Sequence, residues 1–161
     1  MFSALVVEES DDGVRAEVRD ADDEELPEGD VTIDVEFSGV NYKDALAIVD
    51  GRPVVRAFPL VPGIDLAGTV ASSASPHWRP GDAVLLCGWG LGEERWGGLA
   101  ERARVDGAWL TALPDGWTAR DAMAAGTAGS QRAPSSSVMP LVPSPPLVSP
   151  GKSAGTAAGE Y

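Results

Sequence analysis

The stretch "VTIDVEFSGVNYKDALAIVDG", residues 31–51, contains the change from strand to helix on which the predicted fold depends. Its first half alternates apolar and polar side chains, and a period of two indicates a half-buried β-strand. The apolar face would comprise Val31, Ile33, Val35 and Phe37. In the second half, Asn41 can cap a helix, Asp44 lies in its first turn and Gly51 can end it. We therefore predict a strand that leads into a short helix, with polar side chains at the junction.

The flanking sequence is rich in strands on both sides of this stretch. Upstream, the acidic turn "SDDG" separates two apolar runs, which predicts a β-hairpin. Downstream, one further short helix is expected after Thr118, a good N-cap. The remaining predicted strands lie within residues 64–72, 79–88, 97–107 and 108–114. Because strands and helices do not alternate regularly, the pattern favours a mainly β fold with short helices, built as a small, distorted antiparallel barrel.

The charge balance excludes some classes of partner. The formal net charge is −13, from 25 acidic and 12 basic residues. Such a chain repels phosphate backbones and anionic lipid surfaces, so we expect neither a nucleic-acid nor a membrane partner. The acidic runs near the N-terminus lack the ligand spacing of a calcium loop, and we interpret them as solvated loops.

The cysteine count and the N-terminus favour a cytoplasmic location. Cys87 is the single cysteine, so no disulfide can form within the chain. The start "MFSALVVEES" has no basic region and only a short apolar run, unlike a signal peptide. No stretch approaches the roughly 20 apolar residues of a membrane-spanning helix.

The composition changes after residue 129. Residues 130–161 contain 7 Ser and 6 Pro, without strand or helix periodicity. We divide the chain into a domain at residues 1–129 and a Ser/Pro-rich tail at residues 130–161, which we expect to be disordered. A Pro-rich tail can also act as a docking ligand.

Four stretches, in this order, carry a resemblance to a known family: "SGVNYKDALAI", "FPLVPGIDLAGTV", "GDAVLLCGWGLGEERWGGLAERARV" and "AMAAGTAG". Together they resemble the N-terminal catalytic domain of zinc-independent medium-chain dehydrogenases/reductases. The most similar branch is the quinone-oxidoreductase-like group that includes NADPH-dependent acrylyl-CoA reductases. This resemblance implies a GroES-like, alcohol-dehydrogenase-like N-terminal domain, followed in the family by a Rossmann domain, with the active site in the cleft between them.

The resemblance implies that residues 41–44 lie beside the nicotinamide ring. Asn41 could bond a carboxamide, and Tyr42 could contact the cofactor or supply a proton. Lys43 could meet a phosphate or a thioester oxygen, and Asp44 could fix the geometry of its neighbours. We therefore expect Asn41, Tyr42 and Asp44 as catalytic residues, and Tyr42, Lys43 and Thr127 as cofactor contacts. From spacing alone, an ordinary capping turn explains the same residues.

The sequence "PGIDLAGTV" points away from zinc. Zinc-dependent relatives have Gly-His-Glu where this chain has Gly63, Ile64 and Asp65, and isoleucine cannot ligate a metal. A catalytic zinc needs about three protein ligands, and one Cys and one His cannot anchor such a set. We expect no metal, an exposed His77 and an inert Cys87.

The Rossmann domain that the resemblance implies is not recognisable after residue 129. Thirty-two residues could not build it, and no Gly-rich strand–turn–helix is present there. In the family an aromatic residue and Thr-Ala follow "GTAG", and deleting one nucleotide can convert codons for Phe-Thr-Ala into Ser-Gln-Arg, the residues found at 130–132. We therefore consider a frameshift in the tail, and expect the domain to be incomplete.

Two functions follow as hypotheses. In the first, the full-length protein uses NADPH to reduce an activated C=C bond, such as acrylyl-CoA or another enoyl-CoA, or a quinone, while this chain alone is inactive and self-associates through an uncovered apolar face. In the second, the chain is a stand-alone GroES-like module that binds a partner through its Pro-rich tail. Trp89 and Trp96 could wall a substrate cleft or only cap the barrel.

Overall fold

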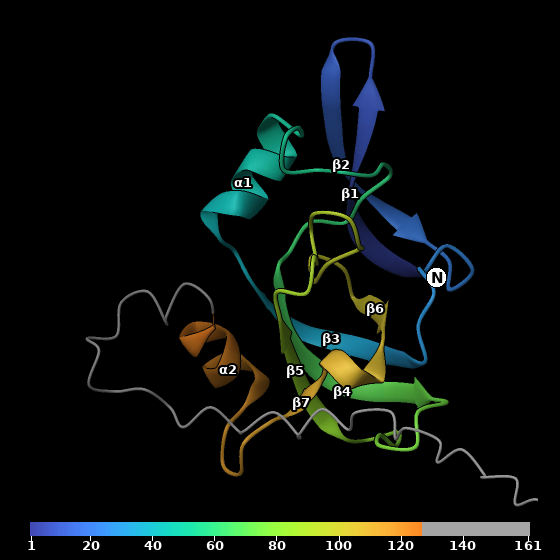
Figure 1. Ribbon diagram of the computed structural model, residues 1–161, viewed down its shortest axis with the longest axis vertical. Helices are drawn as coiled ribbons and strands as arrows, with labels where there is room; N and C mark the ends of the chain where they lie inside the picture. The colour runs from blue at the N-terminus through green and yellow to red at the C-terminus, as the bar shows by residue number, and fades with distance from the viewer. Residues whose placement is uncertain (127–161) are drawn as a thin grey trace, which may run out of the picture.

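The computed structural model describes residues 1–126, so the predictions for Thr127 and for the tail at residues 130–161 lie outside the described residues. Figure 1 shows a mainly β arrangement with two α-helices. The strands are β1 (Phe2–Ser10), β2 (Gly13–Ala21), β3 (Val31–Gly39), β4 (Asp65–Ser73), β5 (Ala83–Cys87), β6 (Arg102–Val105) and β7 (Thr111–Ala112). The helices are α1 (Tyr42–Val49), the 3-10 turn η1 (Gly107–Trp109) and α2 (Ala119–Ala125).

The β1–β2 hairpin is confirmed. Its two strands pair in antiparallel register from Phe2 opposite Ala21 to Ser10 opposite Gly13, which leaves a two-residue turn. Gly13 has a φ of 124°, a backbone conformation that favours glycine at the start of the returning strand. The acidic turn predicted from "SDDG" therefore lies at the exposed tip of the hairpin.

The other five strands form one antiparallel sheet in the order β6-β3-β4-β5-β7. Strand β3 pairs with both β4 and β6, and its register against β4 shifts between Val35 and Phe37. This bulge disrupts the alternation predicted for residues 31–38, because an extra residue turns the following side chains. As a result Phe37 is 44% exposed, whereas Val31 and Ile33 are fully buried.

The two sheets do not close into a continuous barrel within residues 1–126, and β1 instead bonds to the segments that precede β4 and β6. Leu5 N donates to Leu99 O at 2.9 Å, and Val7 N donates to Leu60 O at 2.7 Å. Each of the hydrogen-bonded pairs among strands β1 to β7 lies within one sheet or the other. The predicted mainly β fold is therefore confirmed, with an open form of the distorted barrel.

Both predicted helices are present with the predicted caps. Asn41 is the N-cap of α1, and Asp44 at its third position accepts from the Asn41 backbone N–H. Thr118 is the N-cap of α2, and its hydroxyl accepts from Asp121 N. In Figure 1, α1 lies beside the hairpin and α2 lies against the large sheet, and α2 contacts β3, β4 and β5.

Three apolar clusters form the core. The first lies between the hairpin, α1 and the segment before β4, and includes Val6, Leu60 and Trp96. The second lies on the inner face of the five-stranded sheet and includes Ile33 and Leu66. In the third, Ala119, Ala122 and Met123 of α2 pack against Ala67 of β4. The junction between β3 and α1 therefore lies among elements that are packed on several sides.

Candidate functional site

The junction turn, residues 41–44 at the start of α1, is held in place by the carboxyl group of Asp44. This side chain is completely buried, with 0% of its surface exposed. Its Oδ1 accepts from Gly63 N at 2.9 Å and from Ile64 N at 3.1 Å, while its Oδ2 accepts from Asn41 N at 2.7 Å. Three backbone N–H groups thus satisfy both oxygens of this carboxyl group, which offsets the cost of burying it. Asp44 therefore ties the start of α1 to the loop before β4.

A second buried carboxylate, Asp65, holds the side chain of Asn41. Asp65 is only 1% exposed, and its Oδ2 accepts from Asn41 Nδ2 at 3.0 Å. The backbone oxygen of Asp65 also accepts from Ser38 Oγ at 2.8 Å. The hydrogen bond to Oδ2 orients the NH₂ group of Asn41 toward Asp65. Sequence analysis did not predict this contact between Asp65 and Asn41.

The thiol of Cys87 lies beside Asp65 and is the third polar group described at this junction, after Asp44 and Asp65. Burial, followed by the charge and the hydrogen bond of Asp65, raises the pKa of Cys87 from 9.0 to about 12. The two residues also face each other in the β4–β5 register. A thiol that stays protonated near neutral pH is a poor nucleophile, which agrees with the predicted inert cysteine.

Tyr42 and Lys43 point out of the packed junction. Tyr42 is 79% exposed, although it directly follows the fixed residue Asn41. Lys43 Nζ lies 2.8 Å from Glu93 Oε1, which connects α1 to the loop after β5. The predicted site residues Asn41, Tyr42, Lys43 and Asp44 therefore form one turn, in which Asp44 is buried, Asn41 is partly buried, and Tyr42 and Lys43 are exposed. Thr127 lies outside the described residues.

The loop after β5 packs against the junction through its backbone. Gly88 N donates to Ile64 O at 2.8 Å, and Gly98 N donates to Gly63 O at 2.9 Å. A Cβ on Gly97 would lie 2.1 Å from Gly63 O, so no side chain fits there. Trp96 is buried and its Nε1 donates to Pro59 O at 3.0 Å, whereas Trp89 is 59% exposed. Of the two tryptophans, Trp96 thus belongs to the core and Trp89 to the surface.

No metal cluster forms in the described part of the chain. Within residues 1–126, no group of three or more His, Cys, Asp or Glu side chains is arranged to hold a metal ion. Ile64, which cannot ligate a metal, is buried, and His77 is exposed in the turn between β4 and β5. None of the helices within these residues is long and apolar enough to cross a membrane.

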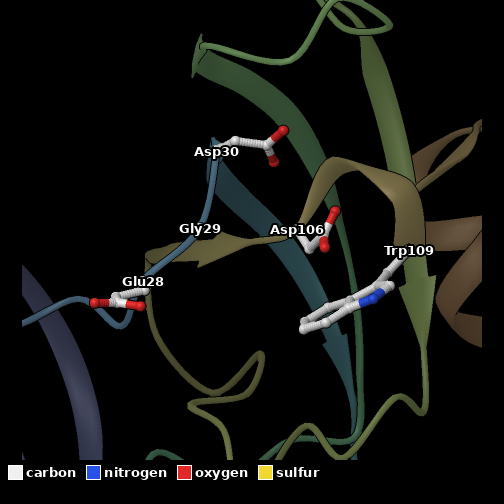
Figure 2. A pocket seen from close by; sticks show the side chains of 5 residues that line it. All are labelled: Glu28, Gly29, Asp30, Asp106 and Trp109. Carbon is white, nitrogen blue, oxygen red and sulfur yellow. The ribbon is translucent and has the colours of Figure 1, made fainter.

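A pocket lies away from the junction, beside η1. Figure 2 shows its lining, which consists of Glu28, Gly29, Asp30, Asp106 and Trp109. Asp30 Oδ1 accepts from Gly107 N at 2.6 Å, and Asp106 Oδ1 accepts from Ala108 N at 2.8 Å. These carboxylates therefore hold the η1 turn, and none of the predicted site residues lines this pocket.

Comparison with known proteins identifies the class of this domain. Residues 27–115 match the family model of the alcohol dehydrogenase GroES-like domain, and the chain belongs to this family. The resemblance inferred from the four sequence stretches is thereby confirmed.

Individual relatives narrow the comparison. The chain is 56% identical over 128 residues to the probable acrylyl-CoA reductase AcuI of Escherichia coli (strain K12), covering 80% of this chain and 40% of the relative. It is 49% identical over 131 residues to the acrylyl-CoA reductase AcuI of Ruegeria pomeroyi, with the same two coverages. The putative quinone oxidoreductase YhfP of Bacillus subtilis is 46% identical over 129 residues, covering 80% of this chain and 39% of the relative. The chain thus spans about 40% of the length of these curated relatives.

Solved structures agree with this comparison. The yhdH oxidoreductase of Salmonella enterica in complex with NADP superposes with a TM-score of 0.76 at 54% identity, covering 79% of this chain and 39% of that chain. The yhfP protein of Bacillus subtilis with NAD bound gives a TM-score of 0.76 at 46% identity, covering 80% and 39%. Similar folds in this family have therefore been solved with a nicotinamide dinucleotide.

Proposed function

We propose that this chain forms one side of the active site of a zinc-independent reductase that transfers hydride from NADPH to an activated carbon–carbon double bond. The proposed substrate class is an enoyl-CoA thioester such as acrylyl-CoA. Two relatives named as acrylyl-CoA reductases, at 56% and 49% identity, and a solved relative with NADP support this assignment. The structural observation that carries it is the junction turn, where buried Asp44 and Asp65 fix Asn41 while Tyr42 stays exposed.

The chemistry of this turn fits a nicotinamide ring. The exposed phenol of Tyr42 offers a flat face and a hydroxyl group. Asn41 uses Nδ2 toward Asp65, and a primary amide has a second N–H and an oxygen with which to bond a carboxamide. Thr127, one residue beyond the described Gly126, is proposed as a further contact. This side of the ring would therefore be held by Asn41, Tyr42 and Thr127.

Each residue of the turn then has a distinct role. NADPH, when bound, supplies the hydride that enters the double bond at the carbon β to the thioester carbonyl. The carbon α to the carbonyl must then gain a proton, and the Tyr42 hydroxyl is the accessible acidic group at the turn. Lys43 can direct an N–H toward a thioester oxygen or a phosphate, because an ammonium has three donors and Glu93 takes one.

Asp44 acts in this scheme by position. Both of its oxygens accept from backbone N–H groups in the interior, so its carboxylate holds the turn and does not deliver the proton. A turn fixed in this way keeps Asn41 and Tyr42 in one geometry, and geometric precision of this kind contributes strongly to catalytic rate.

A quinone is the second candidate substrate. It is favoured by the 46% identity to the relative named as a putative quinone oxidoreductase. A quinone also accepts a hydride equivalent from reduced nicotinamide without a metal. An assay can distinguish the two substrates, because a coenzyme A thioester contains an adenine nucleotide and a quinone does not.

A chimera tests the proposal. The part of the Escherichia coli relative that aligns with this chain is replaced by the corresponding residues of this chain, and NADPH consumption is followed with acrylyl-CoA and with 1,4-benzoquinone. We expect turnover with acrylyl-CoA, and a fall in kcat of roughly 100-fold in Tyr42→Phe, because general acids commonly contribute 10²–10⁴-fold. The exposed Trp117→Ala serves as the matched aromatic control. A folded chimera that binds NADPH but reduces neither substrate would refute the proposal.

A further inference from the structure

Trp89 has a backbone conformation that is unusual for a large side chain. Its φ is 55°, in the left-handed region, and it lies between Gly88 at 82° and Gly90 at 80°. Left-handed backbone costs free energy for any residue with a Cβ, and such strain tends to occur at functional sites. Trp89 is nevertheless 59% exposed, so burial of the indole does not offset this strain.

The indole of Trp89 is held in one orientation by its neighbours. The Trp89 and Trp109 rings stack with centroids 5.8 Å apart and an interplanar angle of 12°. Arg95 Nη1 donates to the Trp89 carbonyl oxygen at 3.2 Å, and its Cζ lies 4.9 Å from the centre of the Trp109 ring. Trp109 supports one face of the Trp89 indole, and more than half of the Trp89 surface remains accessible.

Cationic side chains gather in the same loop region. Glu93 Oε1 lies 2.8 Å from Lys43 Nζ. Arg56 Nη2 lies 3.8 Å from Glu93 Oε2, and Arg56 Nη1 lies 3.8 Å from Glu94 Oε2. Arg95 forms an ion pair with Glu94. These five side chains therefore carry three positive and two negative charges, an excess of one positive charge within this group. This excess favours an anionic group.

This region is continuous with the junction turn. Trp89 follows Cys87 by two residues, and the thiol of Cys87 hydrogen-bonds to Asp65, which holds Asn41. Lys43 belongs to both regions, because it lies next to Tyr42 and pairs with Glu93. The Lys43–Glu93 ion pair therefore links the loop that carries Trp89 to the junction turn.

We propose that Trp89, Arg95, Arg56 and Lys43 form a subsite for the adenosine 3′,5′-bisphosphate end of a coenzyme A thioester, an inference that rests on the proposed function for its choice of substrate. The adenine stacks on the accessible face of Trp89, as nucleobases do on aromatic side chains. The phosphates approach the guanidinium groups, which suit phosphate geometry. The pantetheine arm then extends toward the junction turn.

Calorimetric binding of coenzyme A to the complete 161-residue chain tests this subsite without requiring turnover. We expect Trp89→Ala to weaken binding at least tenfold, and Trp89→Phe, which keeps an aromatic face, to lose less. Trp117→Ala is the matched control for an exposed tryptophan, and Arg120→Gln is the matched control for Arg95→Gln. Coenzyme A should bind more tightly than 3′-dephospho-coenzyme A, and its affinity should fall as salt is added.

Two results would overturn the subsite. One is the absence of coenzyme A binding at millimolar concentration, and the other is unchanged affinity in a folded Trp89→Ala chain. The chimera assay keeps this failure separate from failure of the proposed function. If the chimera reduces acrylyl-CoA with a KM that Trp89→Ala does not change, the reductase proposal stands and the subsite fails. If coenzyme A binds through Trp89 but the chimera reduces nothing, the subsite stands and the reductase proposal fails.

Discussion

Replacement of Asp44 by alanine should destabilise this domain far more than an ordinary capping substitution. The change removes the acceptor of three backbone N–H groups, those of Asn41, Gly63 and Ile64, in a fully buried position. Each buried donor without a partner costs about 1–3 kcal/mol, so three of them give at most about 9 kcal/mol. Water that enters the vacated space will satisfy some donors, and we therefore expect about 3–5 kcal/mol.

Asp44→Asn should fall between wild type and alanine. Its remaining oxygen can still accept from Gly63 N and Ile64 N, while its NH₂ group would face the Asn41 N–H. The loss of one hydrogen bond and the opposition of two donors should cost about 1–3 kcal/mol. The order wild type, asparagine, alanine follows from the number of acceptors that each side chain offers.

Equilibrium urea unfolding of the chain, followed by tryptophan fluorescence and circular dichroism, measures these differences. Asp121→Ala is the matched control, because Asp121 holds the same capping-box position in α2 but is exposed. Its effect should be clearly smaller than that of Asp44→Ala. A cost for Asp44→Ala below about 1 kcal/mol, or equal to the control, would refute the view that this carboxylate holds the junction turn.

Four further predictions concern single residues. The pKa of Cys87, raised by burial and by Asp65 from 9.0 to about 12, should make its alkylation by iodoacetamide slow at pH 8, and Asp65→Asn should accelerate it. The pKa of the Cys87 thiol is higher in the folded chain than in the unfolded chain, so its contribution to stability should be complete below pH 9 and should fall as the pH rises toward 12. The measurement is the difference in unfolding free energy between wild type and Cys87→Ala as a function of pH. Gly68→Ala should cost at least about 1–3 kcal/mol in urea unfolding, because its Cβ would lie 2.1 Å from Asp34 O. Trp89→Gly should leave the unfolding free energy within about 1 kcal/mol of wild type, because relief of the left-handed backbone strain offsets the lost stacking on Trp109. A larger loss of unfolding free energy would argue against strain at Trp89.

Local sequence signals predicted the elements around the site well. Asn41, Asp44 and Thr118 are capping residues whose effect acts within one helical turn, so their positions alone located the starts of α1 and α2. The β1–β2 hairpin followed from a two-residue acidic turn between apolar runs. The alternation of β3 failed at Phe37, because the bulge depends on pairing with β4, about 30 residues away in the chain.

The contacts that organise the site could not be predicted locally. Asp65 reaches Asn41 across 24 residues of sequence, and Asp44 reaches Gly63 across 19. Neither partner can be chosen from spacing, since each depends on how β4 packs beside α1. The conformation of Trp89 left a partial signal in the sequence "GWG", because the flanking glycines permit left-handed backbone. That signal marks strain but does not identify a ligand.

The most direct test of the account is a crystal structure of the chimera with NADP bound. The account predicts that the nicotinamide ring lies against the Tyr42 side chain, with its carboxamide in hydrogen-bonding distance of Asn41, and with Asp44 and Asp65 still holding the turn as in the free chain. A nicotinamide ring bound in a folded chimera without contact to residues 41–43 would contradict the central claim that this turn forms one side of the active site.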